Sequence, residues 1–274
     1  MRAYATNGLG TAYGERLRFY TSEQEVQWDG TGINPNDSKP CDNMPTVTDH
    51  EGNVYNTVQI GGQCWTKENM RCTTSPSTGT SILSSYANRY SLSGKKACYY
   101  KDDPNNAENS YGLLYNWCAA VDTFNIMLGE VSTFYDISDA PNVIFTNPRR
   151  GICPQGWHVP SELDWIQLTN YVGNQSEYMC GTDNTSIAKA LASTTGWKSS
   201  EEFCSIGNEP SGNNATGFSA VPTLSNSKYT GFWSASQGSI SYSAYLRELG
   251  YDYNTVSRYS EEKSELISVR CLRD

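Results

Sequence analysis

The chain has 274 residues and a formal net charge of −9 with no Lys/Arg-rich run, which argues against a nucleic-acid ligand because its phosphates would be repelled. No apolar stretch approaches the roughly 18 residues of a membrane span, and the N-terminus lacks the basic and apolar regions of a signal peptide. Apolar residues reach only 37%, whereas Tyr occurs 19 times, so we expect a loop-rich fold whose core is formed largely by aromatic side chains. The surplus tyrosines fit either strand positions or a recognition surface.

Nine cysteines indicate an oxidising compartment. They form no C-x-x-C pair, which argues against a zinc site or a thioredoxin-like motif. Because an export signal is missing, we expect this chain to be the C-terminal part of a longer secreted protein with further domains upstream.

The first residues, MRAYATNGLGTAYGERLRFYT, alternate in strand fashion around an Asn7-Gly8 turn. They resemble the last two strands of a fibronectin-type-III or related immunoglobulin-like module. We therefore predict that residues 1–22 are the remnant of a truncated module of that kind. Residues 23–45, rich in Gly, Asn, Asp and Pro, are predicted to be a linker, and 46–274 the main domain.

Residues 53–60 alternate as a strand does, and Gly61-Gly62 permits a two-residue hairpin turn before a returning strand at Cys64. The alternation predicts one face with Val54, Val58 and Ile60, and the other with Tyr55, Thr57 and Gln59.

Three helices are predicted next. Apolar residues from 111 to 124 recur at intervals of three and four. A second helix is expected after Pro160, with Ser161 and Asp164 in a capping-box arrangement and Gly173 at its end. A shorter third helix is predicted around 187–191 and closed by Gly196.

From Gly217 onward the pattern changes to short strands. We expect them at 218–221, 231–235, 245–249, 255–259 and 266–272. Helices first and antiparallel strands later indicate an α+β fold.

Landmark Gly, Trp and Cys residues occur in residues 47–72, in ICPQGWHVPSELDW, GFSAVPTL and GFWSAS, and in the terminal ISVRCLRD. In order and rough spacing they resemble the Fibrobacter succinogenes major paralogous domain family of bacterial surface proteins, from about Pro45 to Asp274. The resemblance implies a C-type-lectin-like fold with two to three helices, a twisted antiparallel sheet and long polar loops, used for display and binding.

The same resemblance implies a disulfide between Cys153 and Cys271, which chain-entropy reasoning values at about 5 kcal/mol. Cys180 with Cys204 is the second predicted pair and Cys41 with Cys64 the third; Cys72, Cys98 and Cys118 stay ambiguous. Because nine is odd, at least one thiol stays free or pairs between chains. We expect Cys118, on an apolar helix face, to be a buried inert thiol.

Enzymatic interpretations find little support. His158 lies in the GWHVP landmark and is predicted to be a hydrogen-bonded scaffold residue, as are Trp233, Arg247 and Arg270 at other landmarks. No hydrolase, zinc-protease, nucleotide or dinucleotide motif occurs. Formylglycine-generating enzymes share the lectin-like fold, but the catalytic cysteine pair near their C-terminus has no counterpart here.

Calcium is the remaining cofactor question. The chain has Glu209-Pro210-Ser211 and no W-N-D, so it departs from the sugar-coordinating loop of calcium-dependent lectins. Another oxygen-rich cluster is compatible with hard cations, but such clusters are more often solvated turns, so we expect no bound metal and keep calcium as the alternative. Its members are Asp102, Asp103, Asn105, Asn106 and Glu108.

The segment 225–262 combines tyrosines with small polar residues, as antibody binding surfaces do. Its predicted ligand-binding residues are Lys228, Tyr229, Ser239, Tyr242, Tyr251, Asp252, Tyr253, Asn254 and Tyr259.

These observations predict a non-enzymatic binding module, extracellular or on the outer cell surface, that recognises a glycan or a protein through its late loops. The alternative is a structural subunit of a surface appendage or cell-wall assembly. A hydrolase or an oxidase ranks third.

Overall fold

The computed structural model divides the chain into two units, Met1–Thr31 and Gly32–Asp274. The described residues are 4–7, 10–13, 30, 32–84, 99–102, 111–122, 148–223, 227–240 and 242–274. In the first unit, β1 (Tyr4–Asn7) pairs with β2 (Gly10–Tyr13) in an antiparallel hairpin. The first strand was predicted, whereas the second alternation was predicted at Leu17 and Phe19, which lie outside the described residues. Its origin in a truncated module stays a prediction.

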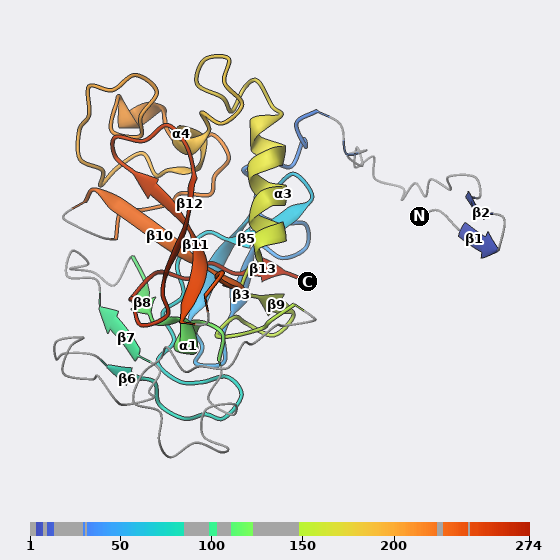
Figure 1. The fold of residues 1–274 in the computed structure, drawn as a ribbon, viewed down its shortest axis with the longest axis vertical. Coiled ribbons are helices and arrows are strands. Elements are labelled where there is room, and N and C mark those ends of the chain that lie inside the picture. Colours follow the sequence, from blue (N-terminus) through green and yellow to red (C-terminus); the bar gives the residue numbers. More distant parts are fainter. Residues whose placement is uncertain are drawn as a thin grey trace. The chain divides into compact units, whose positions relative to one another are not determined.

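A five-stranded antiparallel sheet forms one part of the second unit (Figure 1). Its order is β3 (Thr46–Thr48), β4 (Val54–Ile60), β5 (Gln63–Thr66), β13 (Leu272–Arg273) and β9 (Trp157–His158). The predicted β4–β5 hairpin is present, and Gly61 in its turn has φ 56°. A Cβ there would lie 2.8 Å from the Tyr171 ring, so the turn requires glycine.

The predicted faces of β4 are present and both are packed, because Val58 and Ile60 belong to one hydrophobic cluster and Tyr55 to another. Val54 is half exposed, whereas Tyr55 is fully buried and donates a hydrogen bond from its hydroxyl to Asp49 Oδ2 at 2.8 Å. The buried carboxylate gives the phenol a partner, so the ring of Tyr55 packs inward on its own face of the strand.

Residues 32–45, predicted as part of the linker, belong instead to the second unit. The backbone N–H of Ser38 donates to the carbonyl of Gln59, and that of Gln59 donates to Lys39. Asp37 is buried and accepts hydrogen bonds from the hydroxyls of Tyr171 and Tyr178 at 2.7 and 2.8 Å. Local composition resembles a linker, but these non-local bonds hold the segment against the sheet.

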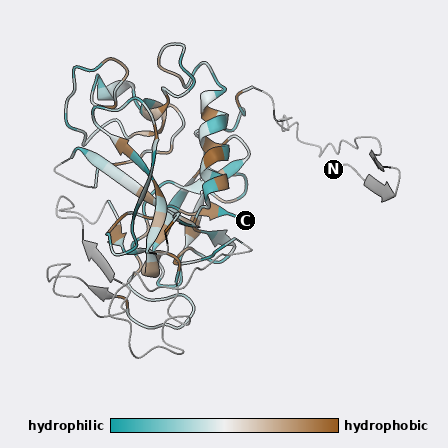
Figure 2. Ribbon diagram, in the orientation of Figure 1, coloured by the Kyte–Doolittle hydropathy of each residue, from teal (hydrophilic) through white to brown (hydrophobic). Residues whose placement is uncertain are grey.

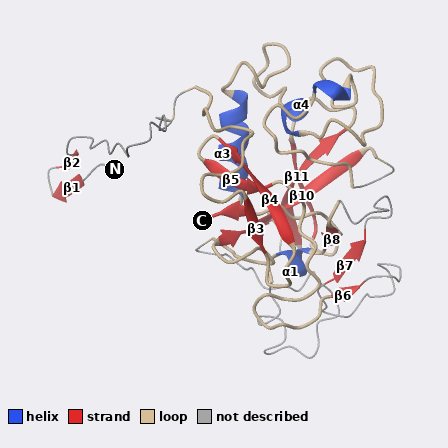
Figure 3. Cartoon of the chain, turned by 180° about the vertical axis from the view of Figure 1, so that it is seen from behind, coloured by secondary structure: helices blue, strands red, loops and turns tan. Residues whose placement is uncertain are grey.

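The long helix α3 (Glu162–Gly173) has the predicted capping box at Ser161 and Asp164. It presents Trp165, Leu168 and Val172 to a hydrophobic cluster that also contains residues of β4, β5 and the late strands. Figure 2 shows the resulting alternation of polar and apolar colour along this helix, and Figure 3 shows it beside the strands from behind. Rings in this cluster pack closely, with the Trp65 and Trp165 centroids 4.9 Å apart.

A second sheet contains β10 (Tyr229–Gln237), β11 (Ser243–Gly250) and β12 (Ser257–Glu262), antiparallel and in that order. These strands match three of the predicted late strands, with shifted ends. The other two predictions were too long. Around Ala220 there is one parallel bridge to Ala192, and of 266–272 only the end is strand, preceded by bridges at Ile267 and Ser268.

The predicted helix at 111–124 was wrong in its first half. Residues Leu113–Tyr115 form β8, and the helix α1 is a single turn, Trp117–Ala120, capped by Asn116. Strand β8 lies in a three-stranded sheet with β7 (Tyr99–Asp102), and β7 pairs in parallel with β6 (Leu83–Ser84).

The predicted third helix is the one-turn α4 (Ala188–Leu191). Its C-cap is Ala192, so it ends before the predicted end at Gly196. A short 3-10 turn, η2, follows at Pro210–Gly212. Among the described residues, no helix is long and apolar enough to cross a membrane.

Three disulfides in which both cysteines are described fasten this α+β unit: Cys41–Cys64, Cys153–Cys271 and Cys180–Cys204. All three were predicted. The expectation for Cys118 was wrong, because this cysteine is disulfide-bonded. The free cysteine of the described residues is Cys72, which is buried. Cys98 lies outside the described residues.

Candidate ligand-binding surface

The register of the β10–β11–β12 sheet separates the predicted ligand-binding residues into two groups. Tyr229 pairs with Gly250 at one end of the sheet, and Gln237 pairs with Ala244 at the other. The two ends are eight residues apart along β10, which at about 3.3 Å per residue is roughly 26 Å. Ser239 and Tyr242 lie in the turn at the second end. The single surface predicted from the segment 225–262 is therefore divided, and these two residues do not join the others.

Three tyrosines lie at the first end, and a fourth, Tyr259, pairs with Leu246 nearer the middle of the sheet and hydrogen-bonds to Tyr253. We call Tyr229, Tyr251, Tyr253 and Tyr259 the tyrosine cluster. The ring centroids of Tyr229 lie 6.2 Å from Tyr251 and 5.8 Å from Tyr253. Burial and then a hydrogen bond with Tyr259 raise the pKa of Tyr253 to about 12. The cluster is half-buried, with Tyr259 42% exposed, so its rings have faces that a ligand could contact.

Gly250 makes this arrangement of rings possible. A Cβ at this position would lie 2.8 Å from Cδ2 of Tyr253 and 2.9 Å from Cε1 of Tyr229. Both rings therefore pack directly on the backbone at the end of β11. Any side chain there would displace them.

The turn that carries Tyr251 and Tyr253 is held by a neighbouring loop. The N–H of Gly207 donates to the carbonyl of Tyr251 at 2.6 Å, and that of Ile206 donates to Tyr253 at 3.0 Å. A Cβ on Gly207 would lie 2.3 Å from the carbonyl oxygen of Lys198 and 2.9 Å from that of Tyr251. The loop is fixed in turn by the Cys180–Cys204 bridge. The rings are thus positioned before any ligand arrives, which lowers the entropic cost of binding.

Two other predicted ligand residues support the turn itself. The Asn254 side-chain amide donates to Ser186 Oγ at 2.9 Å, and the backbone carbonyl of Asn254 accepts from the N–H of Ala188. The carbonyl of Lys228 accepts from the N–H of Tyr251 at 2.7 Å. The Asn254 side chain is therefore occupied in holding the scaffold, and the Lys228 backbone contributes to the same turn.

Charged residues surround the cluster; Asp252 was predicted, whereas the sequence analysis missed Lys198, Glu248 and Glu261. The Lys198 ammonium lies 4.8 Å from the centroid of the Tyr251 ring. Burial and then the charge of Glu261 raise the pKa of Glu248. One carboxylate oxygen of Asp252 is buried without a hydrogen-bond partner among the described residues. The signal for Glu248 was its position in the alternating strand 245–249, where a carboxylate among apolar residues is unusual.

The landmark residues behave as scaffold, as predicted. Trp233 Nε1 donates to the carbonyl of Tyr115 at 2.8 Å. Arg247 contacts both carboxylate oxygens of Glu162 at 3.2 Å. Arg270 is fully buried and donates to the carbonyls of Thr66, Phe218 and Ser219.

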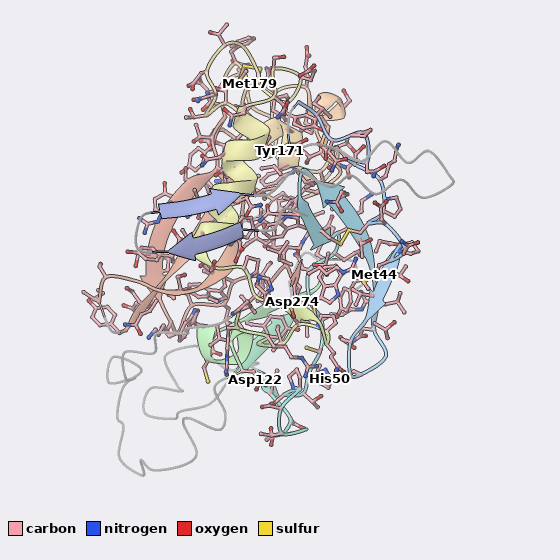
Figure 4. All side chains as sticks on the ribbon, turned by 90° about the vertical axis from the view of Figure 1, so that its right-hand side faces the viewer. Met44, His50, Asp122, Tyr171, Met179 and Asp274 are labelled. Carbon is pink, nitrogen blue, oxygen red and sulfur yellow. A yellow bond between two sulfur atoms is a disulfide. The ribbon has the colours of Figure 1, made fainter. Side chains whose placement is uncertain are left out.

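His158 is bound on both sides by carboxylates. Its Nδ1 lies 2.7 Å from Asp274 Oδ1, labelled in Figure 4, and its Nε2 lies 3.4 Å from Asp164 Oδ2. Burial lowers the pKa of His158, but the hydrogen bonds and charges of Asp164 and Asp274 raise it by more. Asp164 also completes the capping box of α3, so the imidazole joins β9 to the start of the helix. This is the scaffold contact that the sequence predicted.

The sequence model of the Fibrobacter succinogenes major domain matches residues 58–273. The match covers more than half of the chain. The chain belongs to the Fibrobacter succinogenes major domain family. No curated protein and no solved structure matches the chain.

The family match includes every landmark motif after the β4–β5 hairpin, and with it the tyrosine cluster. In this major domain the described residues contain no group of three His, Cys, Asp or Glu that could hold a metal ion. Of the weak calcium candidates, Asp102 ends β7, whereas Asp103, Asn105, Asn106 and Glu108 lie outside the described residues.

Proposed function

We propose that this major domain is a non-enzymatic binding module, with a C-type-lectin-like fold, that recognises a glycan through the tyrosine cluster. The observation that carries the proposal is the convergence of four tyrosines from β10, β12 and the turn after β11. A sugar ring has an apolar face that stacks on aromatic rings and hydroxyl edges that bond to carboxylates and phenols. The cluster offers both kinds of group side by side.

The disulfides support placing the module outside the cell. Bridges such as Cys153–Cys271 persist in secreted and surface proteins and are rare in reducing compartments. They also suit a display role, because they fix loops that regular secondary structure does not hold. We therefore infer a secreted or outer-surface location within a longer bacterial protein.

A glycan array with matched variants tests the proposal. The labelled protein is applied beside the double variant Tyr229→Ala/Tyr253→Ala and the control Tyr242→Ala. Tyr242 is 40% exposed and lies at the opposite end of the sheet, so it controls for the loss of an exposed tyrosine. We expect the double variant to lose at least tenfold in affinity, or about 1.4 kcal/mol, and the control to keep it.

Thermal unfolding of all three proteins shows whether the double variant remains folded. If it does not, Tyr253→Phe tests the same site, because it keeps the ring and removes the hydroxyl next to Tyr259. Equal glycan binding by the protein and the folded double variant contradicts the proposal. So does an empty array together with concentration-dependent self-association, which the structural-subunit alternative predicts.

A further inference from the structure

The register of the second sheet places Glu248 among the rings of the tyrosine cluster. Glu248 pairs with Gly231 on β10 and with Ser257 on β12, both small residues. Tyr229 and Tyr259 are its diagonal neighbours on the same face, because side chains two residues apart share a face. Diagonal neighbours lie about 7–8 Å apart, within reach of long side chains. The carboxyl group thus lies between two tyrosines with little side chain beside it.

A second carboxylate lies on this face. Glu261 is exposed and pairs with Ala244, which shares the alternation of Glu248 but lies four residues farther along β11, or about 13 Å, toward the second end of the sheet. Burial, and then the charge of Glu261, keep the pKa of Glu248 above its ordinary value. Among the described residues neither glutamate has an ion pair, although Arg247 and Arg258 on the opposite face both do.

The cluster already shows which kind of group its rings accept. The Lys198 ammonium over Tyr251 is a cation held by one face of the cluster. The rings of Tyr229, Tyr253 and Tyr259 stand beside Glu248 in the same chemical surroundings, but no cation of the described residues lies over them. A ligand that brought a positive charge would gain attraction from the rings and relieve the repulsion between the glutamates.

We infer that the tyrosine cluster and Glu248, with Glu261 about 13 Å farther along the sheet, select glycans that carry free amino groups, that is, unacetylated amino sugars. The inference rests on the proposed function and names its ligand class. A neutral sugar would leave the two carboxylates to repel each other, and an acidic sugar would add to that repulsion. A basic protein surface is the weaker alternative, because a stable protein interface buries about 800 Å² on each partner and this site is one corner of a sheet.

The test compares two ligands that differ only in acetylation: a β-1,4-linked hexamer of glucosamine and the same hexamer fully N-acetylated. Binding is measured by titration calorimetry at about 0.15 M salt, which screens non-specific attraction to the acidic protein. We expect the glucosamine hexamer to bind at least tenfold more tightly than the acetylated one. Glu248→Gln, which is nearly isosteric, should reduce this ratio to below about threefold.

The matched control is Glu262→Gln. It removes one carboxylate from β12 at the residue next to Glu261, and strand alternation points its side chain to the opposite face. The control should keep the full preference for the amine. Glu261→Gln provides an independent variant at an exposed position, in case Glu248→Gln alters folding.

The possible failures are distinguishable. If the two hexamers bind alike, and both lose affinity in Tyr229→Ala/Tyr253→Ala, the preference for amines is wrong but the proposed function stands. If tetralysine binds as tightly as the glucosamine hexamer and loses affinity equally in Glu248→Gln, the site recognises cations without recognising a sugar, and the inference falls. If no glycan on the array binds the protein more tightly than it binds the tyrosine double variant, the inference and the proposed function are both wrong.

Discussion

The two faces of the β10–β11–β12 sheet differ in whether their charged side chains have partners of opposite charge. On the face toward α3, Arg247 and Arg258 stand directly opposite each other, and both contact Glu162 at the start of the helix. Arg258 also lies 3.7 Å from the centroid of the Tyr245 ring. On the other face, Glu248 and Glu261 lie among tyrosines without a basic partner in the described part of the chain.

The difference separates the ion pairs that hold the fold from the carboxylates that could meet a ligand, since the rest of the second face, with Trp233, Ala244 and Leu246, is packed in the core. Like charges opposite each other in a sheet are destabilising unless a third group offsets them. Glu162 does so for the two arginines, and its place in the first turn of α3 adds a favourable interaction with the helix dipole. The glutamates on the other face lack such a group, which is a cost to stability that a bound cation would remove.

The largest expected effect follows from removing the Glu162 carboxylate that both arginines contact. Glu162→Gln leaves Arg247, which is 4% exposed, without its carboxylate, and we expect the free energy of unfolding to fall by about 3 kcal/mol. Denaturant unfolding measures the change, with Glu262→Gln as an exposed carboxylate control. A loss of less than about 0.5 kcal/mol would show that the ion pairs do not compensate the arginines.

Local chemistry explains which elements could be predicted. The capping box at Ser161 and Asp164 and the Gly61-Gly62 turn depend on residues within a few positions of each other, so the sequence contained their whole explanation. The segment 111–124 did not. Its helical spacing is real, but the N–H groups of Leu113 and Tyr115 donate to Met70 and Ile267, partners that are distant in the sequence.

The same distinction between local and long-range causes applies to the candidate site. Composition located the tyrosines, because aromatic residues among small polar ones mark a surface segment. It could not show that Ser239 and Tyr242 lie at the far end of the sheet, since strand register sets that distance. Glu248 and Lys198 were missed for the same reason, because their relation to the rings depends on pairing and on a loop some fifty residues upstream of Tyr251.

A smaller effect is expected at the other contact of the α3 N-terminus, His158. Its pKa is raised in the folded protein, so the stability that it adds is fully present below its ordinary pKa of about 6.5 and is lost as the pH rises through the raised value. Each unit of pKa difference is worth about 1.4 kcal/mol.

We therefore expect the difference in unfolding free energy between the protein and His158→Asn to shrink as the pH rises from about 6.5 through the raised pKa of His158. Denaturant unfolding at several pH values measures it. A difference that is constant or grows with pH would mean that the imidazole is neutral between Asp164 and Asp274.

The smallest effect is the most direct test of the comparison, because its sign is opposite to that at Glu162. Glu248→Gln removes a half-buried carboxylate and its repulsion with Glu261, so we expect stability to rise by up to about 0.5 kcal/mol at neutral pH. Since the folded-state pKa of Glu248 is raised, the gain should be absent below its ordinary pKa of about 4.5 and appear as the pH rises. Denaturant unfolding of both proteins across this range measures it. A loss of stability at neutral pH would mean that Glu248 has a stabilising partner, and the two faces of the sheet would then be alike.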